Sequence, residues 1–182
     1  MHLGAAPVGV AGDRERRHRP TLWTVQGIPQ AINTGDTMFT LATLAVLRLQ
    51  ETLSAAAALR CALVLKRACL QLTQGQYLDI SYEQRGDLNL VAYWPMVRGK
   101  TASLLSACVE LGAIAGGASD EATAYLKEFA EHLGLAFQAH DDLLGIWGDA
   151  ALTGKSAESD LLSGKKSLPV LHGLSHGGRF AE

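Results

Sequence analysis

Apolar residues recur every three or four positions along most of this chain, a spacing typical of helices that bury one face. Residues 27–50 form the first such segment, with apolar positions at Ile28, Ala31, Ile32, Met38, Leu41, Ala45 and Leu49. The same pattern continues through residues 54–83, 89–97, 100–114 and 121–147, and a last helix is expected from Leu168-Pro169. The sequence shows no strand-like alternation and no internal repeat. It therefore predicts an all-α protein of six or so helices packed as a bundle.

Glycine and polar residues mark the expected helix boundaries. Gly99 interrupts the helical pattern between residues 89 and 114, and Ser119 or Asp120 can cap the helix that follows. Residues 148–166 are rich in Gly, Ser, Asp and Lys and are interpreted as a loop. Residues 1–12 are expected to be irregular, and the whole chain is expected to form a single helical domain.

Composition narrows the possible classes of function. The chain has 182 residues, of which 48% are hydrophobic and 6% aromatic, with a formal net charge of -2. This charge gives no global field that would favour nucleic acid, and no apolar run reaches the roughly 18 residues that a membrane span needs. The three cysteines have no metal-ligand spacing and suit a reducing compartment. The sequence thus predicts a cytoplasmic protein without a transmembrane segment.

Two adjacent carboxylates near the end of the fifth predicted helix carry the strongest chemical signal. Gln138, Asp141 and Asp142 are three and four residues apart and share one helix face, to which Asp149 returns if the helix persists past Gly148. Burying an unpaired carboxylate costs several kcal/mol, so a cation is expected beside this apolar stretch. Mg²⁺ suits oxygen ligands and usually arrives with a substrate phosphate. The alternative is a solvated acidic helix end, which the apolar flanks disfavour.

Basic residues elsewhere supply a possible phosphate side for this site. Lys155 and the pair Lys165-Lys166 stand beside glycines in the loop that follows, and lysines bind phosphate as point charges. Taken singly, each is an ordinary solvated loop lysine. Lys100 and Thr101 follow the expected break at Gly99, where a helix N-terminus would bind an anion or where the threonine would simply cap the helix.

Seven motifs stand in order and at family spacing, although each alone is weak: Arg16-Arg17-x-Arg19-Pro20-Thr21, Ala31-Ile32-Asn33-x-Gly35-Asp36, Gln74-Gly75-Gln76-x-x-Asp79, Lys100-Thr101-Ala102, Phe137-Gln138-x-x-Asp141-Asp142, Gly154-Lys155 and Gly164-Lys165-Lys166-Ser167-Leu168-Pro169. In these motifs the chain resembles the trans-isoprenyl diphosphate synthases, the polyprenyl synthetase family, over residues 12 to 182. The resemblance implies an isoprenoid-synthase-type helical bundle, here partial, that works as a homodimer. It also implies a prenyltransferase that condenses isopentenyl diphosphate with an allylic diphosphate, using Mg²⁺ to assist ionisation.

The resemblance assigns roles position by position. Asp141 and Asp142 match metal ligands of the family's second Asp-rich motif, and Asp79 and Asp160 match auxiliary acidic positions near the metals. Family contacts to the allylic diphosphate, which form the catalytic set, fall on Lys100, Thr101, Gln138, Lys155 and Lys165. Of the arginine pair, Arg16 corresponds to a contact with the allylic diphosphate and Arg17 to a contact with isopentenyl diphosphate.

Three departures from the family pattern limit what the resemblance implies. The first Asp-rich motif is absent, because its expected positions hold Pro7, Val8 and Ala11. Gly145 stands where the second motif usually has its third aspartate. Family chains are also longer at both ends, so we expect a truncated piece whose catalysis is impaired. The alternatives are a non-catalytic partner subunit of a full-length synthase and a class I terpene-cyclase-like protein.

Overall fold

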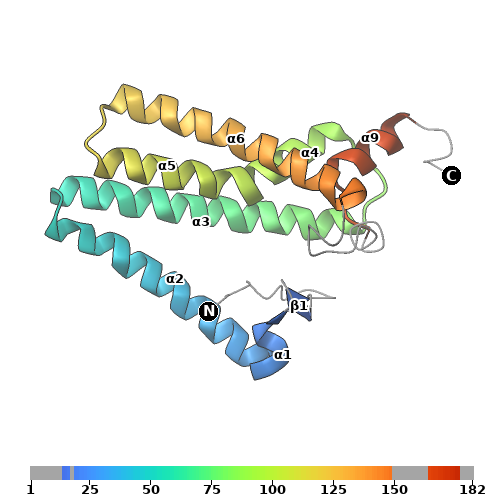
Figure 1. Cartoon of the computed structure of the whole chain (residues 1–182), viewed down its shortest axis with the longest axis horizontal. Helices are drawn as coiled ribbons and strands as arrows, with labels where there is room; N and C mark the ends of the chain where they lie inside the picture. Colours follow the sequence, from blue (N-terminus) through green and yellow to red (C-terminus); the bar gives the residue numbers. More distant parts are fainter. Residues whose placement is uncertain (1–13, 17–18, 149–163, 177–182) are drawn as a thin grey trace. The chain divides into compact units, whose positions relative to one another are not determined.

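The computed structural model describes residues 14–16, 19–148 and 164–176, and within these ranges the chain is predominantly helical (Figure 1). This confirms the predicted all-α class. Two compact units divide the chain, Met1–Ala58 and Leu59–Glu182, and each is described below by itself. The expectation of one domain stays a prediction. Within the described ranges, no helix has the length and apolar character needed to cross a bilayer.

A short strand pair, which the hydrophobic pattern did not predict, is the first element among the described residues of the first unit. Strands β1 (Glu15–Arg16) and β2 (Arg19–Pro20) are antiparallel, with Arg16 opposite Arg19. The all-α class stands, because this pair is confined to four residues. Strands of two residues are too short to display any alternation of apolar and polar positions, so periodicity could not reveal them.

The helices of the first unit follow this pair directly. Helix α1 (Leu22–Gln26) and helix α2 (Ile28–Leu47) meet at Gly27, whose φ of 80° suits a residue without a Cβ. A 3₁₀ turn, η1 (Arg48–Glu51), then ends the helix. The prediction of a helix over residues 27–50 is confirmed, with its last turn tightened, as is common at helix C-termini.

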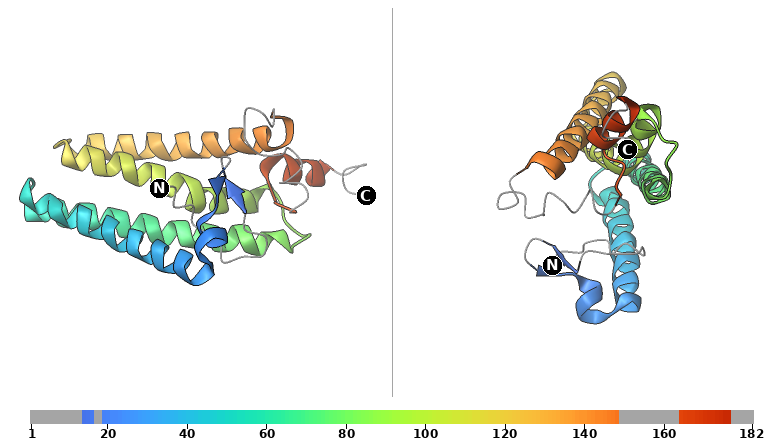
Figure 2. Two further views of the ribbon diagram at one scale, coloured as in Figure 1. Left: turned by 60° about the horizontal axis from the view of Figure 1, so that its bottom comes forward. Right: turned by 90° about the vertical axis from the view of Figure 1, so that its right-hand side faces the viewer.

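The second unit holds the remaining elements, with its boundary inside α3. In chain order they are α3 (Ala55–Glu83), α4 (Leu90–Val97), the π-helical turn η2 (Arg98–Ala102), α5 (Ser103–Ala115), α6 (Asp120–Trp147) and α9 (Leu168–His176). Within this unit α3, α5 and α6 run side by side, and α9 packs against α4 and α6 (Figures 1 and 2). The helices predicted from residue 54 onward are thus confirmed to within a few residues.

Caps and a small core fix the ends of these helices. Ser119 caps α6 by accepting a hydrogen bond from the Ala122 N–H, which resolves the choice between Ser119 and Asp120. Asn89 caps α4 in the same way. A buried core joins the C-terminal end of α3 to α4 and α9. It consists of Tyr82, Tyr93, Met96, Val97 and Leu171.

The expected helix break at Gly99 was wrong. Residues 98–102 form a π-helical turn that continues α4 into α5 without interruption. The reason lies in α3: a Cβ added to Gly75 would lie 2.1 Å from the backbone nitrogen of Lys100, and one added to Gly99 would lie 2.8 Å from the Gln71 carbonyl oxygen. These glycines are therefore used for close backbone contact between helices, and π turns often accompany functional sites.

Candidate functional site

Gln138 connects the carboxylates of α6 to the π turn. The Thr101 hydroxyl donates a hydrogen bond to Gln138 Oε1 (2.7 Å), and Gln138 Nε2 donates to Asp142 Oδ1 (2.9 Å). The same nitrogen lies 3.5 Å from Asp141 Oδ2. The prediction that Gln138, Asp141 and Asp142 share one face of the helix is thus confirmed. Thr101 of η2 contacts this face through Gln138. Because Thr101 donates to the amide oxygen, the amide nitrogen is left to face the carboxylates.

Asp142 is 1% exposed and its carboxylate is surrounded by donors. Oδ2 accepts hydrogen bonds from the Tyr93 hydroxyl (2.8 Å) and from the Leu168 N–H (2.9 Å). Lys165 Nζ lies 3.7 Å from Oδ1. The cation expected beside a buried carboxylate is therefore supplied in this structure by a lysine of the chain, and hydrogen bonds from neutral donors satisfy the remaining lone pairs. Burial, with the neighbouring Asp142 as a smaller cause, raises the pKa of the Tyr93 hydroxyl far above its ordinary value.

Asp141 has a different environment from its neighbour. It is partly exposed, and its one side-chain contact within the described ranges is the 3.5 Å approach of Gln138. The apolar flanks that were expected to bury both carboxylates are themselves exposed, at 60% for Phe137 and 45% for Leu143. The expectation that this part of α6 is buried is therefore correct at Asp142 and wrong at Phe137 and Leu143.

Lys100 forms an ion pair with Asp79 of α3, with their side chains 31% and 13% exposed. Lys100 and Thr101 lie inside a continuous helix, where backbone N–H groups bond to preceding carbonyls. The expectation of an anion site at a helix N-terminus was therefore wrong. Lys100 offers an amine, which Asp79 holds in an ion pair, and Thr101 offers a hydroxyl, which is hydrogen-bonded to Gln138.

Several predicted site residues fall outside these contacts. Arg17, Lys155 and Asp160 lie outside the described residues, and Arg16 belongs to β1 of the first unit. Helix α6 ends at Trp147 and Gly148 is extended, with ψ of 149°, so the helix does not carry its face on to position 149, which is itself outside the described ranges. The roles inferred for these residues from the resemblance stay predictions.

Tyr93 and the contact between Gly75 and Gly99 were not predicted from the sequence. Tyr93 stands in the apolar stretch of α4 and is fully buried. A buried tyrosine needs a partner for its hydroxyl, so its presence among apolar residues was a signal that a polar group lies nearby. No local feature identifies Asp142 as that group, because 49 residues separate the pair.

Mg²⁺ fits this donor set only in part. Among the described residues, no three His, Cys, Asp or Glu side chains lie close enough together to hold a metal by themselves. Mg²⁺ commonly uses one or two carboxylates and completes its octahedron with water and substrate phosphates, however. Asp141 suits this role because it is partly exposed. Asp79 already contacts a lysine, and Asp142 already contacts a tyrosine and a backbone amide.

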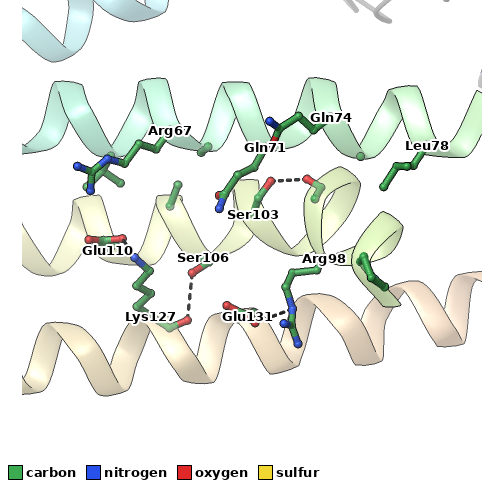
Figure 3. Close-up of a pocket in the computed structure, with 16 residues that line it drawn as sticks. Arg67, Gln71, Gln74, Leu78, Arg98, Ser103, Ser106, Glu110, Lys127 and Glu131 are labelled. Atoms are coloured by element: carbon green, nitrogen blue, oxygen red, sulfur yellow. Dashed lines mark hydrogen bonds and ion pairs between the residues drawn. The ribbon is translucent and has the colours of Figure 1, made fainter. Parts of the chain in front are cut away.

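A separate cavity of about 390 Å³ lies along α3, α5 and α6 (Figure 3). Four of its charged residues form two ion pairs, with 2.9 Å between Arg98 and Glu131 and 2.9 Å between Lys127 and Glu110. None of the predicted site residues that the structure describes lines it. This cavity is therefore distinct from the hydrogen-bonded array around Gln138.

Comparison with known proteins identifies the family. Residues 12–179 match the family model described as polyprenyl synthetase. The chain belongs to the polyprenyl synthetase family. Over 166 residues it is 43% identical to the (2E,6E)-farnesyl diphosphate synthase of Mycobacterium tuberculosis. This alignment covers 91% of this chain and 45% of the synthase. The chain thus spans about half the length of the curated relatives that it matches.

Solved structures of polyprenyl synthetases have the same fold. The polyprenyl synthetase from Streptomyces coelicolor superposes with a TM-score of 0.83 at 45% identity, covering 91% of this chain and 48% of that one. The geranylgeranyl pyrophosphate synthetase from Pyrococcus horikoshii gives a TM-score of 0.84 at 32% identity, covering 92% and 50%. The resemblance drawn from the seven motifs is therefore confirmed at the level of family and fold.

Proposed function

We propose that this chain is part of an isoprenyl diphosphate synthase, a prenyltransferase that joins isopentenyl diphosphate to an allylic diphosphate. The observation that carries the proposal is the hydrogen-bonded array of Thr101, Gln138 and the two aspartates, with lysines at its edges, in a polyprenyl synthetase chain. The reaction breaks the C–O bond between the allyl group and its diphosphate. The isopentenyl double bond then forms the new C–C bond, and a proton is released.

The main requirement of this reaction is to stabilise the negative charge on the departing diphosphate. Mg²⁺ supplies charge neutralisation for a leaving phosphate group when it is bound, and Asp141 is the carboxylate that suits it here. Lys165 and Lys100 would bind diphosphate oxygens, because an ammonium forms strong charge-assisted hydrogen bonds to phosphate. Gln138 and Thr101 would hold Asp141 and its surroundings in a fixed orientation, so that little reorganisation is needed when charge develops.

Binding tests this proposal more directly than turnover, because the first Asp-rich motif is absent. We expect the chain to bind a labelled allylic diphosphate in the presence of Mg²⁺ and to lose this binding on addition of EDTA. The Asp141→Asn variant should lose the Mg²⁺-dependent part. Binding that is indifferent to both EDTA and Asp141→Asn would contradict the assignment of the site.

Turnover tests the expected impairment separately. With Mg²⁺, isopentenyl diphosphate and a labelled allylic diphosphate, we expect little product from the 182-residue chain, because Pro7, Val8 and Ala11 cannot bind a cation. Robust product formation would overturn that expectation while leaving the proposed chemistry intact.

A homodimeric, cytoplasmic state completes the proposal. Family membership supports it. Light scattering on the purified chain tests the dimer, for which the expected mass is twice the 19.3 kDa of one chain. A mass of one chain at micromolar concentration would contradict it.

A further inference from the structure

Asp142 lies where three separate parts of the second unit meet. Its carboxylate accepts hydrogen bonds from Tyr93 of α4 and from the backbone N–H of Leu168, the first residue of α9. Lys165, three residues before α9, approaches the other oxygen at 3.7 Å. One side chain of α6 therefore contacts α4, the start of α9 and the segment that carries a predicted diphosphate ligand.

The contact with Leu168 takes the place of an ordinary helix cap. Ser167 precedes α9 and its carbonyl accepts the hydrogen bond from the Leu171 N–H, as a cap residue's carbonyl does. Its hydroxyl is buried and has no hydrogen-bond partner among the described residues. Asp142 instead accepts from the Leu168 N–H, and a carboxylate at a helix N-terminus is also favoured by the helix dipole.

This arrangement leaves Asp142 poorly suited to ligate a metal. Oδ2 is occupied by the Tyr93 hydroxyl and the Leu168 N–H, and Oδ1 accepts from Gln138. Direct coordination to Mg²⁺ needs an oxygen at about 2.0–2.1 Å from the ion. Coordination through Oδ2 would force the buried Tyr93 hydroxyl to lose its partner, which is costly for a polar group with no access to water. Coordination through Oδ1 would compete with the hydrogen bond from Gln138.

We infer that Asp142 is a positioning residue, which holds the start of α9 and Lys165 beside α6, and that Asp141 alone of the pair faces the metal. The part of this inference that concerns Lys165 and diphosphate rests on the proposed function. The part that concerns α9 stands on the contacts of Tyr93, Asp142 and Leu168 alone. The division of labour follows from burial, because only the partly exposed Asp141 can take on water and phosphate as fellow ligands.

Hydrogen exchange of the Leu168 amide in the full chain tests the first part. Asp142→Asn should accelerate this exchange by about tenfold or more, because a charge-assisted bond to a buried carboxylate is lost. Tyr93→Phe keeps every charge and the ring, so it guards against loss of folding, and it should accelerate the same amide by a smaller factor. Asp141→Asn is the matched control and should leave the amide unchanged. An unchanged rate in Asp142→Asn would overturn the inference.

Binding of inorganic diphosphate with Mn²⁺, measured well below each variant's melting temperature, tests the second part. Removing a negative charge beside Lys165 would by itself tighten binding of an anion. Weaker binding in Asp142→Asn therefore reports lost positioning, and we expect a loss of several-fold. The loss should vanish in a Lys165→Met background, because Asp142 acts through that lysine.

The remaining outcomes separate this inference from the proposed function. Equal losses for Asp142→Asn with and without Lys165 would identify Asp142 as a direct ligand and overturn the inference. Unchanged or tighter binding in Asp142→Asn would reduce its role to stability and also overturn it. If Asp141→Asn has no effect on binding, the proposed metal site fails, whereas faster Leu168 exchange in Asp142→Asn would still support the role of Asp142 in α9.

Discussion

Gly75 of α3 lies against the backbone of Lys100, so close that a Cβ at Gly75 would stand 2.1 Å from the Lys100 nitrogen. No side chain fits there without moving backbone. This contact brings α3 beside the π turn, so that Asp79 meets Lys100. One residue further along the turn, Thr101 reaches Gln138 of α6. The close approach of α3 and η2 therefore places Asp79 beside Lys100, next to the residue that contacts Gln138.

Gly75→Ala tests this contact. We expect it to lower the free energy of unfolding by about 1–3 kcal/mol, the usual cost of overpacking, because backbone must shift. Urea denaturation measures it. The matched control is Gly112→Ala in α5, where an added Cβ meets nothing within 4 Å. That variant should be neutral or more stable by up to about 1 kcal/mol, since alanine favours helix over glycine. Equal stability of the two variants would contradict the contact.

Thr101→Val should weaken the Gln138 network. The variant keeps the shape of the side chain but removes the donor to Gln138 Oε1, which costs about 1 kcal/mol of stability in a typical case. It should also lower the affinity for diphosphate with Mn²⁺, because Gln138 loses its fixed orientation. Thr101→Ser retains the hydroxyl and should behave much like the parent chain in both denaturation and binding.

Asn89→Ala should destabilise the start of α4. The Asn89 side chain accepts hydrogen bonds from the Val91 and Ala92 N–H groups, and losing such a cap costs about 1 kcal/mol. Asn89→Asp preserves the acceptor and serves as the control. Because α4 carries Tyr93, faster hydrogen exchange in α4 of Asn89→Ala should accompany the lower melting temperature. A melting temperature unchanged by Asn89→Ala would count against the cap.

Cysteine reactivity should follow burial. Cys61 is fully buried and burial raises its pKa, with Arg60 as a smaller, opposing cause, whereas Cys108 is exposed. In native buffer a thiol reagent should therefore label Cys108 rapidly and Cys61 only on unfolding. Cys108→Ser should abolish the fast phase. Fast labelling that persists in Cys108→Ser and maps to Cys61 would be incompatible with this burial.

Stability should fall in alkali because of the same thiol. A pKa raised above the ordinary value of 9.0 means that the folded chain keeps a proton that the unfolded chain has lost. The stabilising contribution is thus complete below about pH 8 and declines as the pH rises through 9 and above. Urea midpoints at pH 8 and 10 measure the decline, and Cys61→Ala should reduce it.

Much of the fold could be predicted from the sequence because it depends on local patterns. The spacing of apolar residues located the helices from residue 54 onward, and Ser119 or Asp120 marked the start of α6, with the structure choosing Ser119 as its cap. The shared face of Gln138 and the two aspartates follows from helical geometry alone. Ordered motifs also identified the family, which the match over residues 12–179 confirms.

The tertiary structure decided what depends on residues far apart in the chain. The sequence alone does not distinguish a glycine that breaks a helix from one that allows a neighbouring backbone to approach closely. Only the packing of α3 showed that Gly99 lies in a continuous π turn. Likewise, two adjacent aspartates are equivalent in the sequence. Tyr93 and Leu168 distinguish them by burying and bonding Asp142 while Asp141 stays partly exposed, because burial is a property of the assembled helices and not of any one segment.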